Sequence, residues 1–166
     1  MVAAELLRNA AASQLEAVGW DTLRLPTLAF YADAAARMRD RDAAAAIHEL
    51  LQPWGEQFAW GGASGYGHVR LWLGVTAATL GHDGDADEHF AFACRFHEDR
   101  GINLWAARAH LGWAEALAVR GETARAREHA SRAVELSRAY GYGLIEALAS
   151  PLENGTLALT GERRAT

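Results

Sequence analysis

The sequence predicts an all-α fold, an array of about three antiparallel helix pairs with flanking helices. Three observations lead to this prediction. The composition favours helix, because alanine is abundant while the 166 residues include only three prolines. Two stretches repeat each other about forty residues apart, a spacing typical of helical repeat proteins. Glycines follow the runs of helix-forming residues, at the position where helices commonly end.

The repeat consists of small and large apolar residues at matching positions. We expect Gly74 to face Ala86 within the pair of residues 68–100, because two helices approach closely only where small side chains meet. Larger residues fill the flanking core. The first copy contains Leu73, Gly74, Ala77, Gly81, Ala86, Phe90, Ala93 and Gly101, and the second contains Trp113, Ala114, Leu117, Gly121, Ala126, Ala130, Ala133 and Gly141.

In the first part of the chain we expect helices over residues 3–18, 22 or 26 to 39, and 41–58. Pro53 should end or kink the third of these near Gln52, because proline removes a helix hydrogen bond. Residues 55–67 contain five glycines and are expected to form one long loop. A flexible linker is favoured there over an anion site, since the segment lacks the lysine of a P-loop. Trp54 and Trp60 flank this loop and either cover the core or form an exposed apolar patch.

In the second part we expect helices over residues 68–80, 84–100, 103–120 and 122–140, and a last one that begins near residue 143. Ser150 and Glu153 around Pro151 have the pattern of a capping box, which predicts a break in the last helix. The whole chain is expected to be a single domain. Its parts are a leading helix (1–20), a degenerate pair (21–58), the glycine-rich loop (59–67), two pairs (68–100 and 101–141) and a terminal helix with a tail (142–166).

Charge and composition exclude several classes of function. The net charge of −5 argues against direct nucleic-acid binding, which requires a basic face. All 16 basic residues are arginine, so no lysine is present for P-loop or Schiff-base chemistry. Cys94 is the only cysteine, which excludes an intrachain disulfide. We find neither a signal peptide at the start nor a membrane-length apolar run, and therefore expect a cytoplasmic protein with no membrane partner.

Metal and catalytic sites are not expected. The residues Asp83, Asp85 and Asp87 have the alternate spacing of a calcium loop, but Glu88 and Cys94 replace the glycine and glutamate that such a loop needs. The histidines 89 and 97 stand about 12 Å apart along one helix, too far to share a zinc ion. Cys94 and His97 together supply only two ligands. The serines lack a nucleophile motif. We therefore predict no cofactor and no enzymatic activity.

The repeat resembles the tetratricopeptide repeat. Tyr31, Ala32, Ala35, Ala44, His48 and Leu51 align as a degenerate first pair. The segments 72–81 and 107–126 are similar to the tetratricopeptide-like C-terminal sensor region of bacterial LuxR-type regulators and of ATPase-linked nucleotide cyclases. This likeness covers roughly residues 20–145. It implies a bacterial signalling or transcription-regulating context, either as a fragment or as a free-standing relative.

In that architecture the first helix of each pair lines a concave groove, which implies a set of binding residues. The expected function is a non-catalytic module that binds a protein, a peptide or other domains of a larger parent protein. The alternatives are a small-molecule pocket in the concave face and, more remotely, an enzyme; a homodimer is left open. The same charged side chains would also fit a solvated face with local ion pairs. The residues expected in the groove are Asp33, Arg37, His68, Trp72, Arg108 and Glu115.

Overall fold

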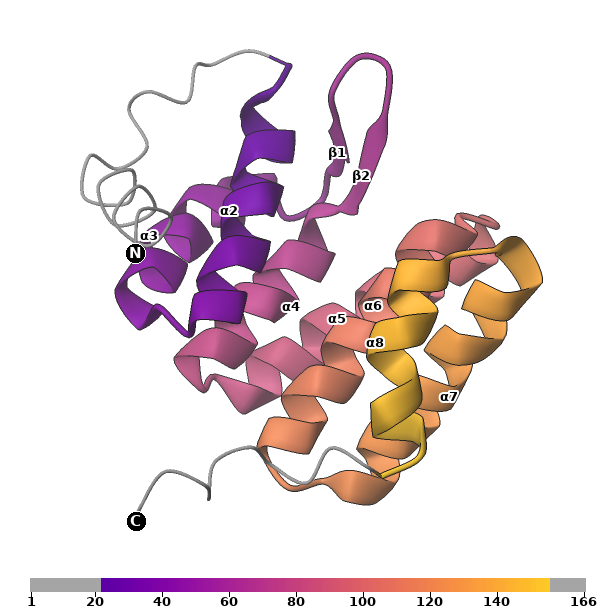
Figure 1. Cartoon of the computed structure of the whole chain (residues 1–166). Helices are drawn as coiled ribbons and strands as arrows, with labels where there is room; N and C mark the ends of the chain where they lie inside the picture. The colour runs from indigo at the N-terminus through magenta and orange to yellow at the C-terminus, as the bar shows by residue number, and fades with distance from the viewer. Residues whose placement is uncertain (1–21, 156–166) are drawn as a thin grey trace. The chain divides into compact units, whose positions relative to one another are not determined.

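The computed structural model describes residues 22–155, which form the α-helices α2–α8 and one two-stranded hairpin (Figure 1). An all-helical fold is therefore confirmed. Internal contacts divide the chain into two compact units, residues 1–96 (unit 1) and 97–166 (unit 2). The leading helix expected over residues 3–18 lies outside the described residues. The repeat pairing and the single-domain organisation stay predictions.

Unit 1 begins with α2 (Arg24–Met38) and α3 (Arg41–Leu51), which pack against each other. Asp40 lies between them and caps α3, because its Oδ1 accepts a hydrogen bond from the Ala43 amide (3.1 Å). Helix α3 ends at Leu51, and Pro53 lies in the short 3-10 turn η1 (Gln52–Trp54) that follows. The predicted end near Gln52 is therefore confirmed.

The segment expected as a loop contains a β-hairpin, which corrects the sequence prediction. Strand β1 (Phe58–Trp60) pairs antiparallel with β2 (Gly65–His68). The register shifts between the pairs Phe58–His68 and Trp60–Gly65, so the hairpin contains a bulge. Gly65 is required at its position because a Cβ there would stand 2.6 Å from Cε1 of Phe58. The glycines therefore permit close packing of the hairpin rather than a long loop.

Helices α4 (Val69–Leu80) and α5 (Asp83–Asp99) follow the hairpin. Gly81 ends α4 in a left-handed conformation (φ 76°), as expected of a helix C-cap. The predicted contact between Gly74 and Ala86 stays a prediction, and the three atoms that a Cβ at Gly74 would approach most closely all belong to the ring of Phe90. The glycine thus makes room for an aromatic ring. The fully buried side chains of this unit include Leu28, Ile47, Leu51, Leu71 and Phe90.

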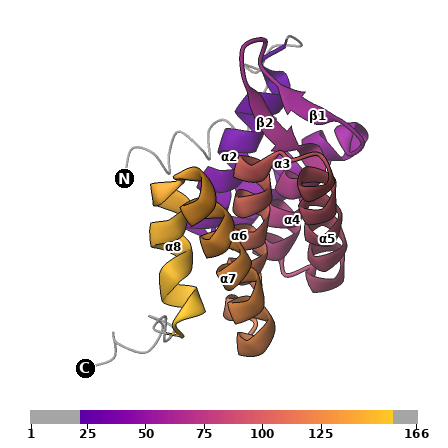
Figure 2. The ribbon, with the colours of Figure 1, turned by 90° about the vertical axis from the view of Figure 1, so that its right-hand side faces the viewer.

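Unit 2 is a bundle of α6 (Asn103–Val119), α7 (Thr123–Tyr140) and α8 (Gly143–Glu153), which lie side by side in both ribbon views (Figures 1 and 2). Small side chains dominate its core, which lets the helix backbones approach closely. An ion pair between Arg138 and Glu146 (2.8 Å) links α7 to α8. The core residues are Ala106, Ala107, Leu111, Ala114, Ala130, Ala133, Val134, Leu136, Ile145, Ala149 and Leu152.

The predicted break in the last helix is wrong, because α8 continues through Pro151 to Glu153. The hydroxyl of Ser150 does not cap a new helix and instead donates to the Glu146 carbonyl (2.8 Å) within the same one. Leu152 is buried in the core of unit 2, which holds the final turn in place. Tertiary packing therefore outweighs the hydrogen bond that proline removes.

Across residues 22–155, none of the helices has the length and apolar content that crossing a lipid bilayer demands.

Candidate binding site at the hairpin

The hairpin of unit 1 is held in place by contacts with three helices. The Trp72 Nε1 on α4 donates to the carbonyl oxygen of Tyr66 (2.8 Å). The Tyr66 ring meets Phe30 of α2 edge-on, with 5.3 Å between ring centroids. On the other side, His68 lies 4.4 Å from the Phe96 ring of α5. The hairpin is therefore a fixed part of unit 1 rather than a flexible linker.

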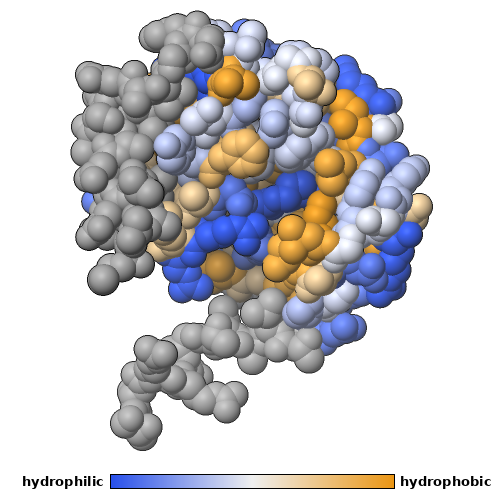
Figure 3. All heavy atoms as spheres, turned by 45° about the horizontal axis from the view of Figure 1, so that its top comes forward, coloured by the Kyte–Doolittle hydropathy of each residue, from blue (hydrophilic) through white to orange (hydrophobic). Residues whose placement is uncertain are grey.

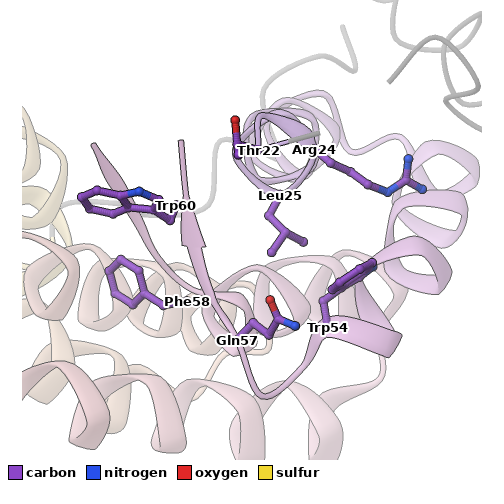
Figure 4. Close-up of a pocket in the computed structure, with 7 residues that line it drawn as sticks. All are labelled: Thr22, Arg24, Leu25, Trp54, Gln57, Phe58 and Trp60. Atoms are coloured by element: carbon purple, nitrogen blue, oxygen red, sulfur yellow. The ribbon is translucent and has the colours of Figure 1, made fainter. Parts of the chain in front are cut away.

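A pocket lies between the start of α2 and the hairpin, with a volume of about 240 Å³. Phe58 and Trp60 lie at one end of it and Trp54 and Arg24 at the other, with Leu25 between them (Figure 4). Three of its seven lining residues are aromatic, and the lining contains one basic side chain and no acidic one. The lining residues are Thr22, Arg24, Leu25, Trp54, Gln57, Phe58 and Trp60.

Large hydrophobic side chains are exposed beside this pocket. Trp60 is 54% exposed, Phe30 is 62% exposed and Leu23 is 55% exposed. They are neighbours, because a Cβ added to Gly61, the residue after Trp60, would lie within 4 Å of both Leu23 and Tyr66, and Tyr66 in turn contacts Phe30. At this end of the molecule, hydrophobic residues reach the surface among polar ones (Figure 3). We call the surface formed by Leu23, Phe30, Trp60 and Tyr66 the hairpin patch.

The residues expected in a groove of unit 1 are placed in two different ways. Asp33 and Arg37 form an ion pair within α2 (2.6 Å), on a partly exposed face. His68 and Trp72 are buried, with exposures of 2% and 5%. The expectation that these two side chains face an open groove is therefore corrected. His68 caps α4 and packs on Phe92 and Phe96, and Trp72 anchors the hairpin.

In unit 2, Arg108 and Glu115 lie on the same face of α6, as their spacing predicts. The Nη1 of Arg108 stands 4.0 Å from Oε2 of Glu115, which makes a long ion pair. The Glu115 side chain is close to half exposed, whereas the Arg108 side chain is largely covered. A partly exposed ion pair of this length contributes little to stability. Its role in binding stays a prediction.

A cluster of polar side chains that the sequence did not predict lies between α6 and α7 of unit 2. His110 is 7% exposed, and its Nδ1 stands 3.0 Å from Nδ1 of His129. The His110 Nε2 lies 3.5 Å from Oε1 of Glu98, an oxygen that also accepts a hydrogen bond from Nε of Arg132 (2.8 Å). The His129 ring stacks on Trp113 with 3.9 Å between centroids. Burial lowers the pKa of His110 to about 4, against the opposing effect of the Glu98 charge.

Within the described residues, no group of three or more histidine, cysteine, aspartate or glutamate side chains is arranged to hold a metal ion. Cys94 is a buried free thiol. Aspartates 83 and 85 lie in the first turn of α5, where their negative charge interacts favourably with the helix dipole.

Comparison with known proteins finds no family model, no curated protein and no solved structure that matches the chain.

Sequence reasoning anticipated part of the hairpin site and missed the histidine cluster. The sequence indicates that Trp54 and Trp60 can form an exposed patch, but it does not join Leu23 and Phe30 to them. Grouping these residues depends on the contact of α2 with the hairpin. For the cluster, a signal was present, because His89 and His129 stand at matching positions of the repeat. The matching partners are Arg70 in one copy and His110 in the other.

Proposed function

We propose that this protein is a non-catalytic binding module, and that the hairpin patch with the adjoining pocket is where a peptide segment of a partner protein binds. The observation that supports the proposal is the grouping of exposed Leu23, Phe30 and Trp60 around an aromatic pocket. Exposed aromatic groups of this kind are typical of interaction sites, where tryptophan and tyrosine often dominate the binding energy.

The size and charge of the pocket indicate the kind of segment that fits. A volume of about 240 Å³ lies below the roughly 300–1,000 Å³ of pockets that enclose small-molecule ligands. It suits one large apolar side chain, which the walls of Trp54, Phe58 and Trp60 would surround. Because the lining carries an arginine and no acidic residue, charge complementarity favours a segment with acidic rather than basic flanks.

The resemblance to tetratricopeptide-like sensor regions supports the same class of function, since helical repeat arrays present surfaces to partners. We therefore place the protein in a bacterial signalling or regulatory system of the cytoplasm, where it binds a protein partner or other domains of its parent protein. A small-molecule sensor is the alternative, and an enzyme is the remote one.

The proposal is tested by selecting peptides from a random display library against the immobilised full chain. Affinities of the enriched peptides are then measured by titration calorimetry for the parent, for Trp60→Ala and for Phe30→Ala. We expect each substitution to weaken binding by about 1–3 kcal/mol, roughly 5- to 150-fold. Leu144→Ala is the matched control, because Leu144 is also a large exposed hydrophobic residue (75%) but lies in unit 2.

The expected peptides contain a large apolar residue with acidic neighbours. The proposal is overturned if both Trp60→Ala and Phe30→Ala leave the affinity of the enriched peptides unchanged. It is also overturned if the library yields no enriched peptide. Peptides that bind Leu144→Ala less tightly would move the site to unit 2.

A further inference from the structure

The histidine pair of unit 2 joins two helices through a single shared hydrogen. His110 comes from the middle of α6 and His129 from the first half of α7, and their Nδ1 atoms stand 3.0 Å apart. Two nitrogens at that distance have room for one hydrogen between them, so one ring donates and the other accepts. The contact requires that one of the two Nδ1 atoms has no proton.

The surrounding groups determine which ring takes each role. The Nε2 of His110 stands 3.5 Å from Oε1 of Glu98 without forming a hydrogen bond, and the nearby negative charge favours a hydrogen on Nε2. His110 then keeps a bare Nδ1, which accepts from the Nδ1–H of His129. An added proton on Nε2 of His129 would leave this contact undisturbed. The Trp113 ring, 3.9 Å from the His129 ring, stabilises the resulting cation.

A second added proton finds no ring nitrogen outside the contact. It must go to Nδ1 of His110, and the two rings would then present N–H groups to each other at 3.0 Å. Both rings would be positively charged and beside the guanidinium of Arg132, with Glu98 as the nearest carboxylate. The second carboxylate, Glu135, is engaged with Arg132 at 2.7 Å. These groups of α5, α6 and α7 surround the pair, and His110 itself is buried, so water cannot screen the repulsion.

We propose that His110 and His129 form an acid-sensitive latch between α6 and α7. The latch holds while the pair has taken up at most one added proton, and it opens when His110 is also protonated. Opening separates two helices of the small core of unit 2, which otherwise consists mainly of alanine contacts. Acidification would thereby loosen the contact between α6 and α7 in unit 2.

The direction of the effect follows from the pKa of His110. Burial lowers this pKa from its ordinary 6.5 to about 4. Between these two values the unfolded chain binds more protons at this residue than the folded one, so stability is complete above pH 6.5 and is lost as the pH falls toward 4. At pH 4.5 this corresponds to a rise in the opening equilibrium constant of roughly 50-fold relative to neutral pH.

The test is hydrogen–deuterium exchange of the full chain at pH 7.5 and pH 4.5, with rates corrected for the intrinsic effect of pH on exchange. We expect peptides from residues 103–140 to lose protection by roughly 50-fold at the lower pH. His110→Gln, which cannot be charged, should remove most of this difference. His82→Gln is the control, because it removes an exposed histidine from unit 1.

A second variant keeps the proposal testable if His110→Gln fails to fold. His129→Gln replaces the facing nitrogen with an amide whose oxygen can accept from a protonated His110, so the acid-induced loss should shrink. A residue with only a structural role would instead lower protection equally at both pH values. The latch is refuted if wild type and both glutamine variants lose protection in residues 103–140 to the same extent on acidification.

Discussion

The ring of Phe90 lies so close to Gly74 that a Cβ on residue 74 would stand 3.1 Å from both Cγ and Cδ1 of the ring. At the matching positions of unit 2 the chain has Ala114 and Ala130. In unit 1 a glycine accommodates a phenylalanine ring, whereas the aligned positions of unit 2 hold two alanines, both of them buried.

From this contact we predict that Gly74→Leu destabilises unit 1. The added side chain has to displace a fully buried ring, and overpacking of this kind costs about 1–3 kcal/mol or more. Thermal unfolding followed by circular dichroism measures the effect. Gly84→Leu is the control, since a Cβ at Gly84 meets no atom within 4 Å. Equal melting temperatures for Gly74→Leu and the parent would show that the contact is not tight.

Trp72→Phe should loosen the hairpin without unfolding the helices. The substitution keeps an aromatic ring in the core but removes the donor that bonds the Tyr66 carbonyl at 2.8 Å. Loss of this partly buried hydrogen bond costs about 1 kcal/mol. Hydrogen exchange of residues 58–68 reports the change, and peptide affinity should fall with it. Unchanged protection of these residues would mean that Trp72 does not anchor the hairpin.

Arg108→Ala distinguishes the hairpin patch from the groove that the repeat resemblance implies. If a partner contacts the α6 face, this substitution should weaken binding by about 1–3 kcal/mol. We expect instead that the peptides selected against the full chain keep their affinity, because Arg108 belongs to unit 2 and pairs with Glu115. Titration calorimetry with Trp60→Ala measured in parallel decides between the two sites.

Stability should not depend on metal ions. The aspartates at the start of α5 lack the ligands of a calcium loop, and the described residues contain no group of three ligands for a metal. Addition of calcium, zinc or a chelator should leave the melting temperature unchanged. A saturable rise with one ion would contradict this, since a ligand that binds the native state stabilises it.

The sequence by itself determined most helix boundaries, because these depend on local chemistry. Gly81, Gly101, Gly121 and Gly141 all adopt positive φ at the ends of their helices, as their positions predict. Pro53 ends α3 for an equally local reason, since it lacks an amide hydrogen. Alanine at regular intervals likewise indicates the helical class, because it favours helix locally.

Only the tertiary structure decided the features that join distant segments. The hairpin depends on Gly65 lying under Phe58 and on Trp72 reaching Tyr66. The last helix continues through Pro151 because Leu152 is buried in the core. His110 and His129 meet because α6 and α7 pack at one particular register. The physical reason is the same in each case: local propensities are worth a few tenths of a kcal/mol to about 1 kcal/mol per residue, and burial of one large side chain outweighs them.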